Sequence, residues 1–346
     1  MQAEIIDPLE KIKLEPRGLP ELSQVETELY RELEGGPGPI RELTSMIHAG
    51  GKRIRPQLVL YSGLLFSGSV TTGMVRTAVA AELIHTASLI HDDIIDGASL
   101  RRHQPSFNQT RGVQIAVLAG DYLLARSLGI LAGEGLSTVM AGLTGTICEM
   151  CRGEFFQAEE RFNFGLTLEA YYQRIASKTA ILFQFCCTGG ATAGGAAMNQ
   201  LATLREFGLH LGLAFQIRDD LMDWCGDPEQ LGKPGHTDMS QGTITLPLLF
   251  LFQDRAFAEK FQKRLVHEGG NATKIISPDL VREIEGWLWS SGAIARSEGV
   301  ITAHLIRAKR VLQQLPFGRA RDGLSGLIRE LESEWAQDRY CNPDPP

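Results

Sequence analysis

The sequence predicts an all-α fold in a single domain, and three observations support this. Apolar residues recur with helical spacing over long segments, and convincing period-2 alternation, which is typical of strands, is absent. Apolar residues make up 43% of the 346 residues, enough for a sizeable core. A motif of clustered aspartates occurs once in each half of the chain, so both halves are expected to face one cavity.

The expected elements follow in chain order. Residues 1–20 are polar and contain proline, so they are expected to form an N-terminal arm outside the core. A helix is predicted over 21–34, where the breaker cluster Gly35-Gly36-Pro37-Gly38-Pro39 ends it. Residues 72–91 are apolar or small on nearly every face, which predicts a helix buried on all sides. Further helical patterns cover 113–132, 136–160, 168–198, 200–224 and 245–266. The predicted domain spans 21–340, and 341–346 form a short C-terminal tail.

One segment without a formal charge, Thr179 to Leu204, is long enough to span a bilayer. It also contains Gln184, Asn199 and Gln200 together with two Gly-Gly pairs, and it is poor in Leu, Ile and Val for a membrane helix. We therefore expect a buried, closely packed helix and no transmembrane segment.

Charge and cysteine content narrow the class of protein. Thirty-four Lys and Arg against 41 Asp and Glu give a net charge of −7, which argues against a nucleic-acid-binding protein. The N-terminal sequence MQAEIIDPLEKIK carries charges where a secretory signal needs an apolar run. Six scattered Cys suit a reducing compartment. The expected location is the cytoplasm.

Two clusters of the form D-D-x-x-D lie inside helical patterns, 127 positions apart. Aspartates four positions apart share one helical face, where their like charges repel, and Asp is a poor helix former. A solvated surface explains one such cluster, but two clusters in apolar surroundings indicate a bound cation. Carboxylate oxygens suit Mg²⁺, which combines one or two protein carboxylates with substrate phosphates. The six candidate ligands are Asp92, Asp93, Asp96, Asp219, Asp220 and Asp223.

Basic residues near these clusters complete a set suited to phosphates. Gly50-Gly51-Lys52-Arg53-Ile54-Arg55-Pro56 places three cations before the start of a helix. Each basic residue taken singly is more typical of a solvated surface, whereas together with two acidic clusters they indicate a diphosphate site, since Arg grips phosphate bidentately and Lys acts as a point charge. The other candidates are Arg101, Arg102, Lys178 and Lys233.

Over roughly residues 25–340 the sequence resembles the trans-isoprenyl diphosphate synthases, or polyprenyl synthetases. The segments that carry the resemblance are GGKRIRP at 50–56, ELIHTASLIHDDIIDGASLRRHQPS at 82–106, GDYLLA at 120–125, SKTA at 177–180, FQIRDDLMD at 215–223 and LGKP at 231–234. Two DDxxD motifs in this order, with GGKRxRP upstream, are highly specific for the family. The resemblance implies a bundle of antiparallel helices around a deep central cavity.

The resemblance also implies residue roles. The six aspartates match the ligands of Mg²⁺ and the allylic diphosphate, with further contacts from Arg101, Lys178 and Lys233. The isopentenyl diphosphate site is implied at Lys52, Arg55, His85 and Arg102. Thr179 and Gln216 match residues that line the reaction centre. His85 on its own would more often be a core histidine, and only the motif promotes it. The implied partners are the two diphosphate substrates, a second copy of the chain or a small subunit, and a membrane surface for product release.

Two positions depart from the family pattern. The family commonly has Gly two residues after the Pro of GKP, and a Lys near the end of the same loop. His236 and Thr243 occupy these positions. The second departure removes one cation from the allylic diphosphate site and leaves the closure of this loop open.

Product length is the remaining variable. Ala87 and Ser88 lie about one turn before Asp92, where a turn advances about 5.4 Å, and Ile84 lies one turn further back. Shorter-product relatives often place an aromatic residue there, so an all-trans product of about C30–C40 is expected. The alternatives are a C15–C20 synthase and a catalytic subunit that needs a partner chain. A terpene cyclase is disfavoured by the second DDxxD motif, and a non-catalytic subunit by the presence of both motifs.

Overall fold

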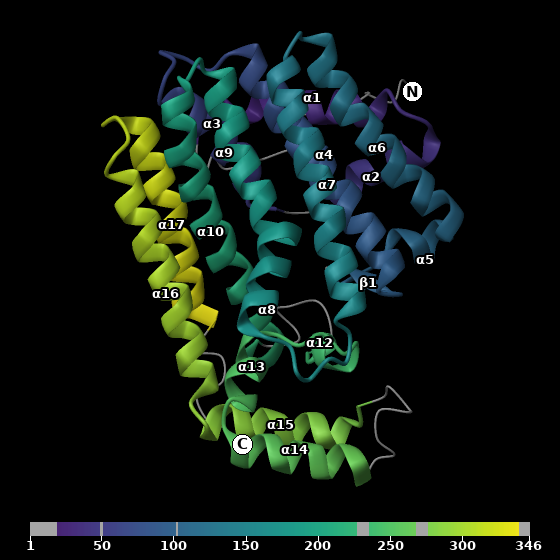
Figure 1. Ribbon diagram of the computed structural model, residues 1–346. Helices are drawn as coiled ribbons and strands as arrows, with labels where there is room; N and C mark the ends of the chain where they lie inside the picture. Colours follow the sequence, from purple (N-terminus) through teal and green to yellow (C-terminus); the bar gives the residue numbers. More distant parts are fainter. Residues whose placement is uncertain (1–18, 49–50, 102, 227–234, 268–275, 339–346) are drawn as a thin grey trace, which may run out of the picture.

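Figure 1 shows the protein as a computed structural model, in which residues 19–48, 51–101, 103–226, 235–267 and 276–338 are described. Nearly all regular structure in these ranges is helical, which confirms the predicted all-α fold. The α-helices are α1 (Leu22–Glu34), α2 (Gly38–His48), α3 (Ile54–Leu64), α4 (Thr72–Ile95), α5 (Phe107–Arg111), α6 (Val113–Gly133), α7 (Ser137–Glu159), α8 (Leu168–Ile175), α9 (Ile181–Ala193), α10 (Met198–Cys225), α12 (Thr237–Ser240), α13 (Leu246–Phe252), α14 (Arg255–His267), α15 (Pro278–Ser290), α16 (Ala293–Leu312) and α17 (Arg319–Asp338).

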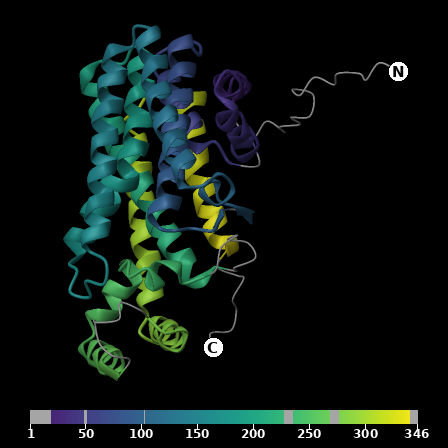
Figure 2. The ribbon, with the colours of Figure 1, turned by 90° about the vertical axis from the view of Figure 1, so that its right-hand side faces the viewer.

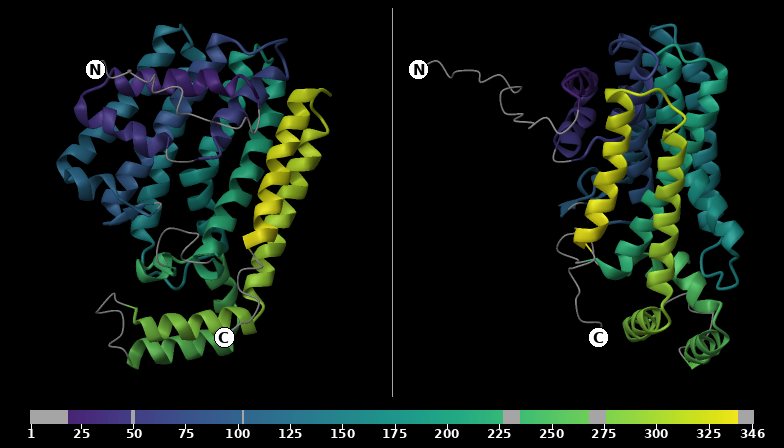
Figure 3. Two further views of the ribbon diagram at one scale, coloured as in Figure 1. Left: turned by 180° about the vertical axis from the view of Figure 1, so that it is seen from behind. Right: turned by 90° about the vertical axis from the view of Figure 1, so that its left-hand side faces the viewer.

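The long helices form a bundle. In Figure 1, α4, α6, α7, α9, α10, α16 and α17 run roughly along one direction. Figure 2, turned by 90°, shows α14 and α15 almost end-on beneath the bundle, so this pair crosses the bundle direction. The left view of Figure 3 shows α16 and α17 side by side along one edge, with α1 lying across the bundle direction.

Three element predictions need correction. The segment 168–198 is not one α-helix: α8 runs into a π-helix, η2 (Ala176–Ala180), and α9 follows. The segment 245–266 forms two helices, α13 and α14. No strand was expected, yet β1 (Leu100–Arg101) and β2 (Gln104–Pro105) pair as a small antiparallel hairpin. A two-residue strand is too short to show alternation, so the sequence pattern could not reveal it.

Helix α4 lies at the centre of the bundle, as its apolar composition predicts. The hydroxyl of Thr71 accepts from the backbone N–H of Met74 at 3.3 Å and caps its N-terminus. From Met74 to Ile84 almost every side chain is buried, whichever face of the helix it is on. The helix ends at Ile95, so the first aspartate motif lies at the C-terminal end of this buried helix.

Glycines explain why the uncharged segment 179–204 packs inside a protein. A Cβ at Gly190 would lie 2.1 Å from the carbonyl oxygen of Val59 on α3, and one at Gly194 would lie 2.4 Å from that of Gly63. Helices α3 and α9 therefore touch backbone to backbone, which only glycine permits. The prediction of a buried helix is confirmed for α9, whereas Met198 at the start of α10 is 82% exposed.

In the described part of the chain, one helix is long and apolar enough to cross a membrane by length and composition. This helix is α6, and 39% of its apolar window is buried. Its exposed apolar side chains include Val113, Val117 and Leu118.

Candidate active site

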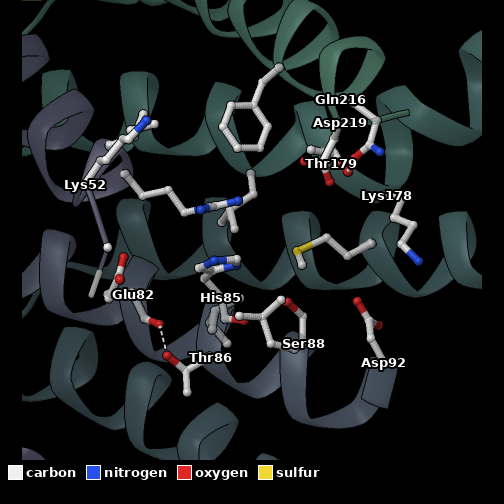
Figure 4. A pocket seen from close by; sticks show the side chains of 18 of the residues that line it. Lys52, Glu82, His85, Thr86, Ser88, Asp92, Lys178, Thr179, Gln216 and Asp219 are labelled. Carbon is white, nitrogen blue, oxygen red and sulfur yellow. Dashed lines mark hydrogen bonds between the residues drawn. The ribbon is translucent and has the colours of Figure 1, made fainter. Parts of the chain in front are cut away.

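A cavity of about 2350 Å³ opens into the bundle, and nearly all the described candidate residues line it. Figure 4 shows Lys52 at one end, His85 between, and Asp92 and Lys178 at the other end. Thr179, Gln216 and Asp219 face Asp92 from the opposite wall of the cavity. The side chains from the two aspartate motifs therefore face one space, as the sequence predicts. Arg102 and Lys233 lie outside the described residues.

The first aspartate motif lies in the last turn of α4. Asp92 faces the cavity, where burial raises the pKa of its carboxyl to about 7, aided by Glu154 and Asp96 and opposed by Lys178. A helix C-terminus carries partial negative charge, which also disfavours carboxylates there. Asp96 accepts from Arg161 at 2.8 Å. A bound cation would therefore stabilise the ionised carboxylate of Asp92.

Asp93 has a different environment from Asp92. It is 2% exposed, and Arg101 grips it bidentately, with Nη2 2.6 Å from Oδ1 and Nε 2.9 Å from Oδ2. The β1–β2 hairpin places Arg101, and the Ser106 hydroxyl donates to the Ala98 carbonyl at 2.6 Å to close it. Both Asp93 and Arg101 line the cavity, but in this state they neutralise each other.

The three aspartates of the second motif also lie in different environments. Asp219 and Asp220 line the cavity, whereas Asp223 is not among the lining residues. Asp220 is 5% exposed and accepts from Tyr171 at 2.6 Å and from Gln216 at 2.8 Å. Burial nevertheless raises the pKa of Asp220 to about 6.

Asp223 contacts the backbone at the start of α12. It is 2% exposed, its Oδ2 accepts from the backbone N–H of Asp238 at 3.0 Å, and its carbonyl accepts from His236 N at 2.8 Å. The structure therefore does not bring all six aspartates to the cavity surface, and five of them line it.

The π-helix η2 carries Lys178 and Thr179, and short π-helical insertions are frequent at functional sites. A Cβ at Gly153 of α7 would lie 2.5 Å from Lys178 N, so glycine lets this segment approach α7 closely. Lys178 Nζ lies 2.6 Å from Glu154 Oε1. Burial would lower the pKa of Lys178, but Asp92 and Glu154 outweigh it and raise the pKa. The Thr179 hydroxyl donates to Gln216 at 2.6 Å, so these two predicted residues meet.

The far end of the cavity is cationic. Lys52, Arg55 and His85 all line it, and the Arg55 guanidinium lies 5.2 Å from the centre of the Phe183 ring. Lys52 pairs with Glu334 of α17. The structure thus brings together the three described residues that were predicted to bind isopentenyl diphosphate.

An apolar wall begins one turn before Asp92. Ala87 and Ile84 are each 3% exposed and line the cavity together with Ser88. Leu124 of α6 and Ile147 and Met150 of α7 line it as well. Ala80 and Ala81, two turns further back, are fully buried and do not line it.

The two departures from the family pattern have defined positions. His236 adopts φ 62°, the left-handed conformation that favours glycine, and its ring lies 5.0 Å from that of Trp224. Thr243 is 7% exposed and lines the cavity without a charge.

Several site residues were not predicted from the sequence. Glu154 and Gln157 contact Lys178, Arg161 contacts Asp96, and Tyr171 contacts Asp220. They lie outside the motifs, and each contacts a residue far away in the chain, which a single sequence does not reveal. The contact between Arg218 and Glu334 was missed for the same reason.

The donors in the cavity fit a hard divalent cation. They are carboxylate oxygens from two helices, and burial, with Glu154 and Asp96 nearby, raises the pKa of Asp92, so its ionised form lacks a counter-charge. Among the described residues, no three His, Cys, Asp or Glu side chains converge closely enough to hold a metal by themselves. This suits an ion that takes one or two protein carboxylates and completes its shell with water and phosphate oxygens.

Comparison with known proteins identifies the family. The Polyprenyl synthetase family profile matches residues 40–278. Heptaprenyl diphosphate synthase component 2 of Geobacillus stearothermophilus is 38% identical over 312 residues, covering 90% of this chain and 93% of that protein.

Solved structures agree. A polyprenyl synthase from Caulobacter crescentus, complexed with calcium and isoprenyl diphosphate, is 29% identical with a TM-score of 0.83, covering 90% of this chain and 94% of that one. Heptaprenyl diphosphate synthase from Staphylococcus aureus is 28% identical with a TM-score of 0.84, covering 90% and 97%. The chain belongs to the polyprenyl synthetase family.

Proposed function

We propose that the protein is a Mg²⁺-dependent trans-prenyltransferase, which condenses isopentenyl diphosphate head-to-tail onto an allylic diphosphate. The observation that carries this proposal is one cavity with carboxylates from two helices at one end, cations at the other and an apolar wall between. Neither a terpene cyclase nor a non-catalytic subunit would need both ends.

The Asp92 end suits the allylic diphosphate. Asp92, Asp96 and Asp219 would hold Mg²⁺, whereas Asp93, Asp220 and Asp223 already accept hydrogen bonds from Arg101, Tyr171 and the backbone of Asp238. Mg²⁺ held by these carboxylates would supply positive charge to the diphosphate leaving group. Lys178, held near Asp92 by Glu154, adds a cation to the same group. Thr179 and Gln216, which face Asp92 across the cavity, would line the position of the reacting carbon.

The Lys52 end suits isopentenyl diphosphate. Its diphosphate would contact Lys52, Arg55 and His85, which leaves its alkene pointing toward the Asp92 end. The alkene attacks the allylic cation, and a proton then passes to the departed diphosphate. Apolar side chains around this centre exclude water, which would otherwise capture the cation.

The product is proposed to be an all-trans polyprenyl diphosphate of about C30–C40, because small side chains at Ala87 and Ser88 leave the path beside α4 open for at least one helical turn, about 5.4 Å. A heptaprenyl chain, named in two relatives, falls within this range. The alternative is a shorter product of about C15–C20, which would require a floor at this first turn.

The deciding experiment is incubation of the purified chain with labelled isopentenyl diphosphate and allylic primers of increasing length, followed by product sizing. Growth to about C30–C40 supports the proposal, whereas arrest near C20 replaces it with a shorter-product synthase. Absence of elongation by the chain alone, with elongation after addition of a small partner subunit, identifies a catalytic subunit. Absence of any condensation with either protein refutes the function.

We also propose that the chain associates with a second copy or with a small subunit through α6 and α7. Val113 and Leu118 on α6 and Phe155 on α7 are 55%, 63% and 69% exposed, unusual for large apolar side chains. "Component 2" in the name of one relative indicates a two-component enzyme there. Leu118→Asp should reduce the mass measured by light scattering, and an unchanged mass contradicts this surface. Cytoplasmic location, with membrane contact during product release, remains part of the proposal.

A further inference from the structure

Among the carboxylates that line the cavity, Glu334 contacts cations at the Lys52 end. Glu334, on the C-terminal helix α17, forms an ion pair with Lys52 Nζ, and its Oε2 lies 3.6 Å from Arg218 Nη2. The side chains of Glu334 and Arg218 are 16% and 14% exposed. A single carboxylate therefore bridges two cations that come from the segment before α3 and from α10.

Both cations line the cavity that is proposed to bind the substrates. Lys52 is proposed to bind the diphosphate of isopentenyl diphosphate, and Arg218 directly precedes Asp219 in the second aspartate motif. All three residues line the same cavity. Because a carboxylate and a phosphoryl group accept hydrogen bonds from the same Lys and Arg donors, an arriving diphosphate has to compete with Glu334 for them.

The ion pair is not needed to hold α17 in place. Leu324, Leu327, Ile328 and Leu331 of this helix are all buried in the core. The Lys52 side chain is 47% exposed, and ion pairs of such exposure stabilise a fold little. The pair with Lys52 therefore stabilises the fold little, whereas it places Glu334 beside a cation that is proposed to bind substrate.

We propose that Glu334 is an internal anion that competes with the substrate diphosphate for Lys52 and Arg218, and so sets the affinity of this end of the cavity. The proposal rests on the proposed function. This competition would also help during successive additions of isopentenyl diphosphate. The diphosphate of isopentenyl diphosphate stays on the product, which must vacate the Lys52 end before the next addition. A carboxylate that reclaims the two cations favours that departure.

The test uses inorganic pyrophosphate as the probe, in EDTA. Without metal, the aspartate clusters repel an anion, so calorimetry reports the cationic end alone. Glu334→Gln should bind pyrophosphate roughly three- to ten-fold more tightly than the wild type, because a charged competitor of modest strength is removed. Glu330→Gln removes the same charge one turn earlier on α17, where Glu330 also lines the cavity but pairs with no cation of the described chain. Its affinity should change less than two-fold.

Kinetics provide a second readout. The KM for isopentenyl diphosphate should fall in Glu334→Gln, the KM for the allylic primer should not, and kcat should fall or stay level because the product leaves the Lys52 end more slowly. Unchanged or weaker pyrophosphate binding in a folded Glu334→Gln protein overturns the inference. If the wild type neither binds pyrophosphate nor condenses the two substrates, the proposed function itself fails, which is a separate result.

Discussion

Arg53 and Glu26 form a buried ion pair across 27 positions of sequence, with Arg53 Nη2 3.2 Å from Glu26 Oε2. Their side chains are 9% and 6% exposed. Arg53 also donates to Glu82 at 3.0 Å and to the carbonyl of Ile47 at 2.8 Å. Although Arg53 stands between Lys52 and Arg55 in the motif, its donors are engaged by the protein. It ties α1, α2 and α4 to the start of α3.

Replacing Arg53 by Met should therefore reduce stability more than substrate affinity. Two buried carboxylates would lose their counter-charge, which costs about 3–5 kcal/mol. The free energy of unfolding in urea measures this loss. Lys52→Ala is the matched control, because its partly exposed ion pair stabilises by at most about 1 kcal/mol. A loss below about 1 kcal/mol in Arg53→Met would show that Arg53 does not anchor the segment.

Asp92→Asn should abolish prenyl transfer yet stabilise the metal-free protein. The pKa of Asp92 is raised from 3.8 to about 7, so its ionised form is disfavoured in the fold. Stability from this group is complete below about pH 4 and is lost as the pH rises through 7. At pH 8 in EDTA the variant should be more stable by on the order of 2 kcal/mol.

Adding Mg²⁺ with pyrophosphate provides the control for Asp92→Asn. It should raise the melting temperature of the wild type and leave the variant almost unchanged, because the variant lacks a carboxylate that holds the ion. A variant that loses helical signal together with activity would instead show that the motif is structural.

Sequence periodicity was sufficient for most of the fold. Long helices such as α6 and α10 are predicted from helical spacing, and α4 from side chains that are apolar or small on nearly every face. The π-helix at Ala176–Ala180 was missed because residues 168–198 carry helical spacing throughout, and its close approach to Gly153 joins segments that are distant in sequence. The break between α13 and α14 was missed because residues 245–266 carry helical spacing throughout.

The sequence predicted which residues belong to the site, but not how their environments differ. Asp92 and Asp93 are adjacent and chemically identical in the sequence. Only the structure separates them, since Arg101 returns on a hairpin to grip Asp93 while Asp92 faces the cavity. The contact between Glu334 and Lys52 joins residues near opposite ends of the chain, and a single sequence contains no signal for such a contact.

Acid should weaken the packing of α10 on α16 through a pair of histidines. The Nδ1 atoms of His210 and His304 lie 3.1 Å apart, and the Tyr172 ring lies 6.0 Å from that of His304. Burial, followed by the proximity of His210 and Arg307, lowers the pKa of His304 from 6.5 to about 4. The unfolded chain takes up this proton at about pH 6.5, so stability is complete above that pH and is lost as the pH falls toward 4.

The measurement is the free energy of unfolding of the wild type and of His304→Asn between pH 7.5 and 4.5. The difference between the two proteins should change by on the order of 2 kcal/mol over this range, since other titrating groups cancel. If the free energies of unfolding of the two proteins change in parallel with pH, protonation of His304 does not affect stability.

Product length should depend on the side chain at Ala87. Ala87 is 3% exposed and lines the cavity one turn before Asp92, at the start of the apolar wall that Ile84, Ile147 and Met150 continue. A phenyl ring at this position would block the growing chain while leaving the metal ligands in place. Ala87→Phe should therefore shorten the product to about C20 or below, because the first helical turn of about 5.4 Å becomes the floor. Condensation of the first isopentenyl unit should continue at a rate within about three-fold of the wild type, since the reacting centre is unchanged.

Ala80→Phe is the control. Ala80 lies on the same helix but outside the cavity lining, so overpacking there should reduce stability without changing the product length. An Ala87→Phe enzyme that makes the wild-type product, or a wild type that already stops at C20, would show that the floor lies elsewhere.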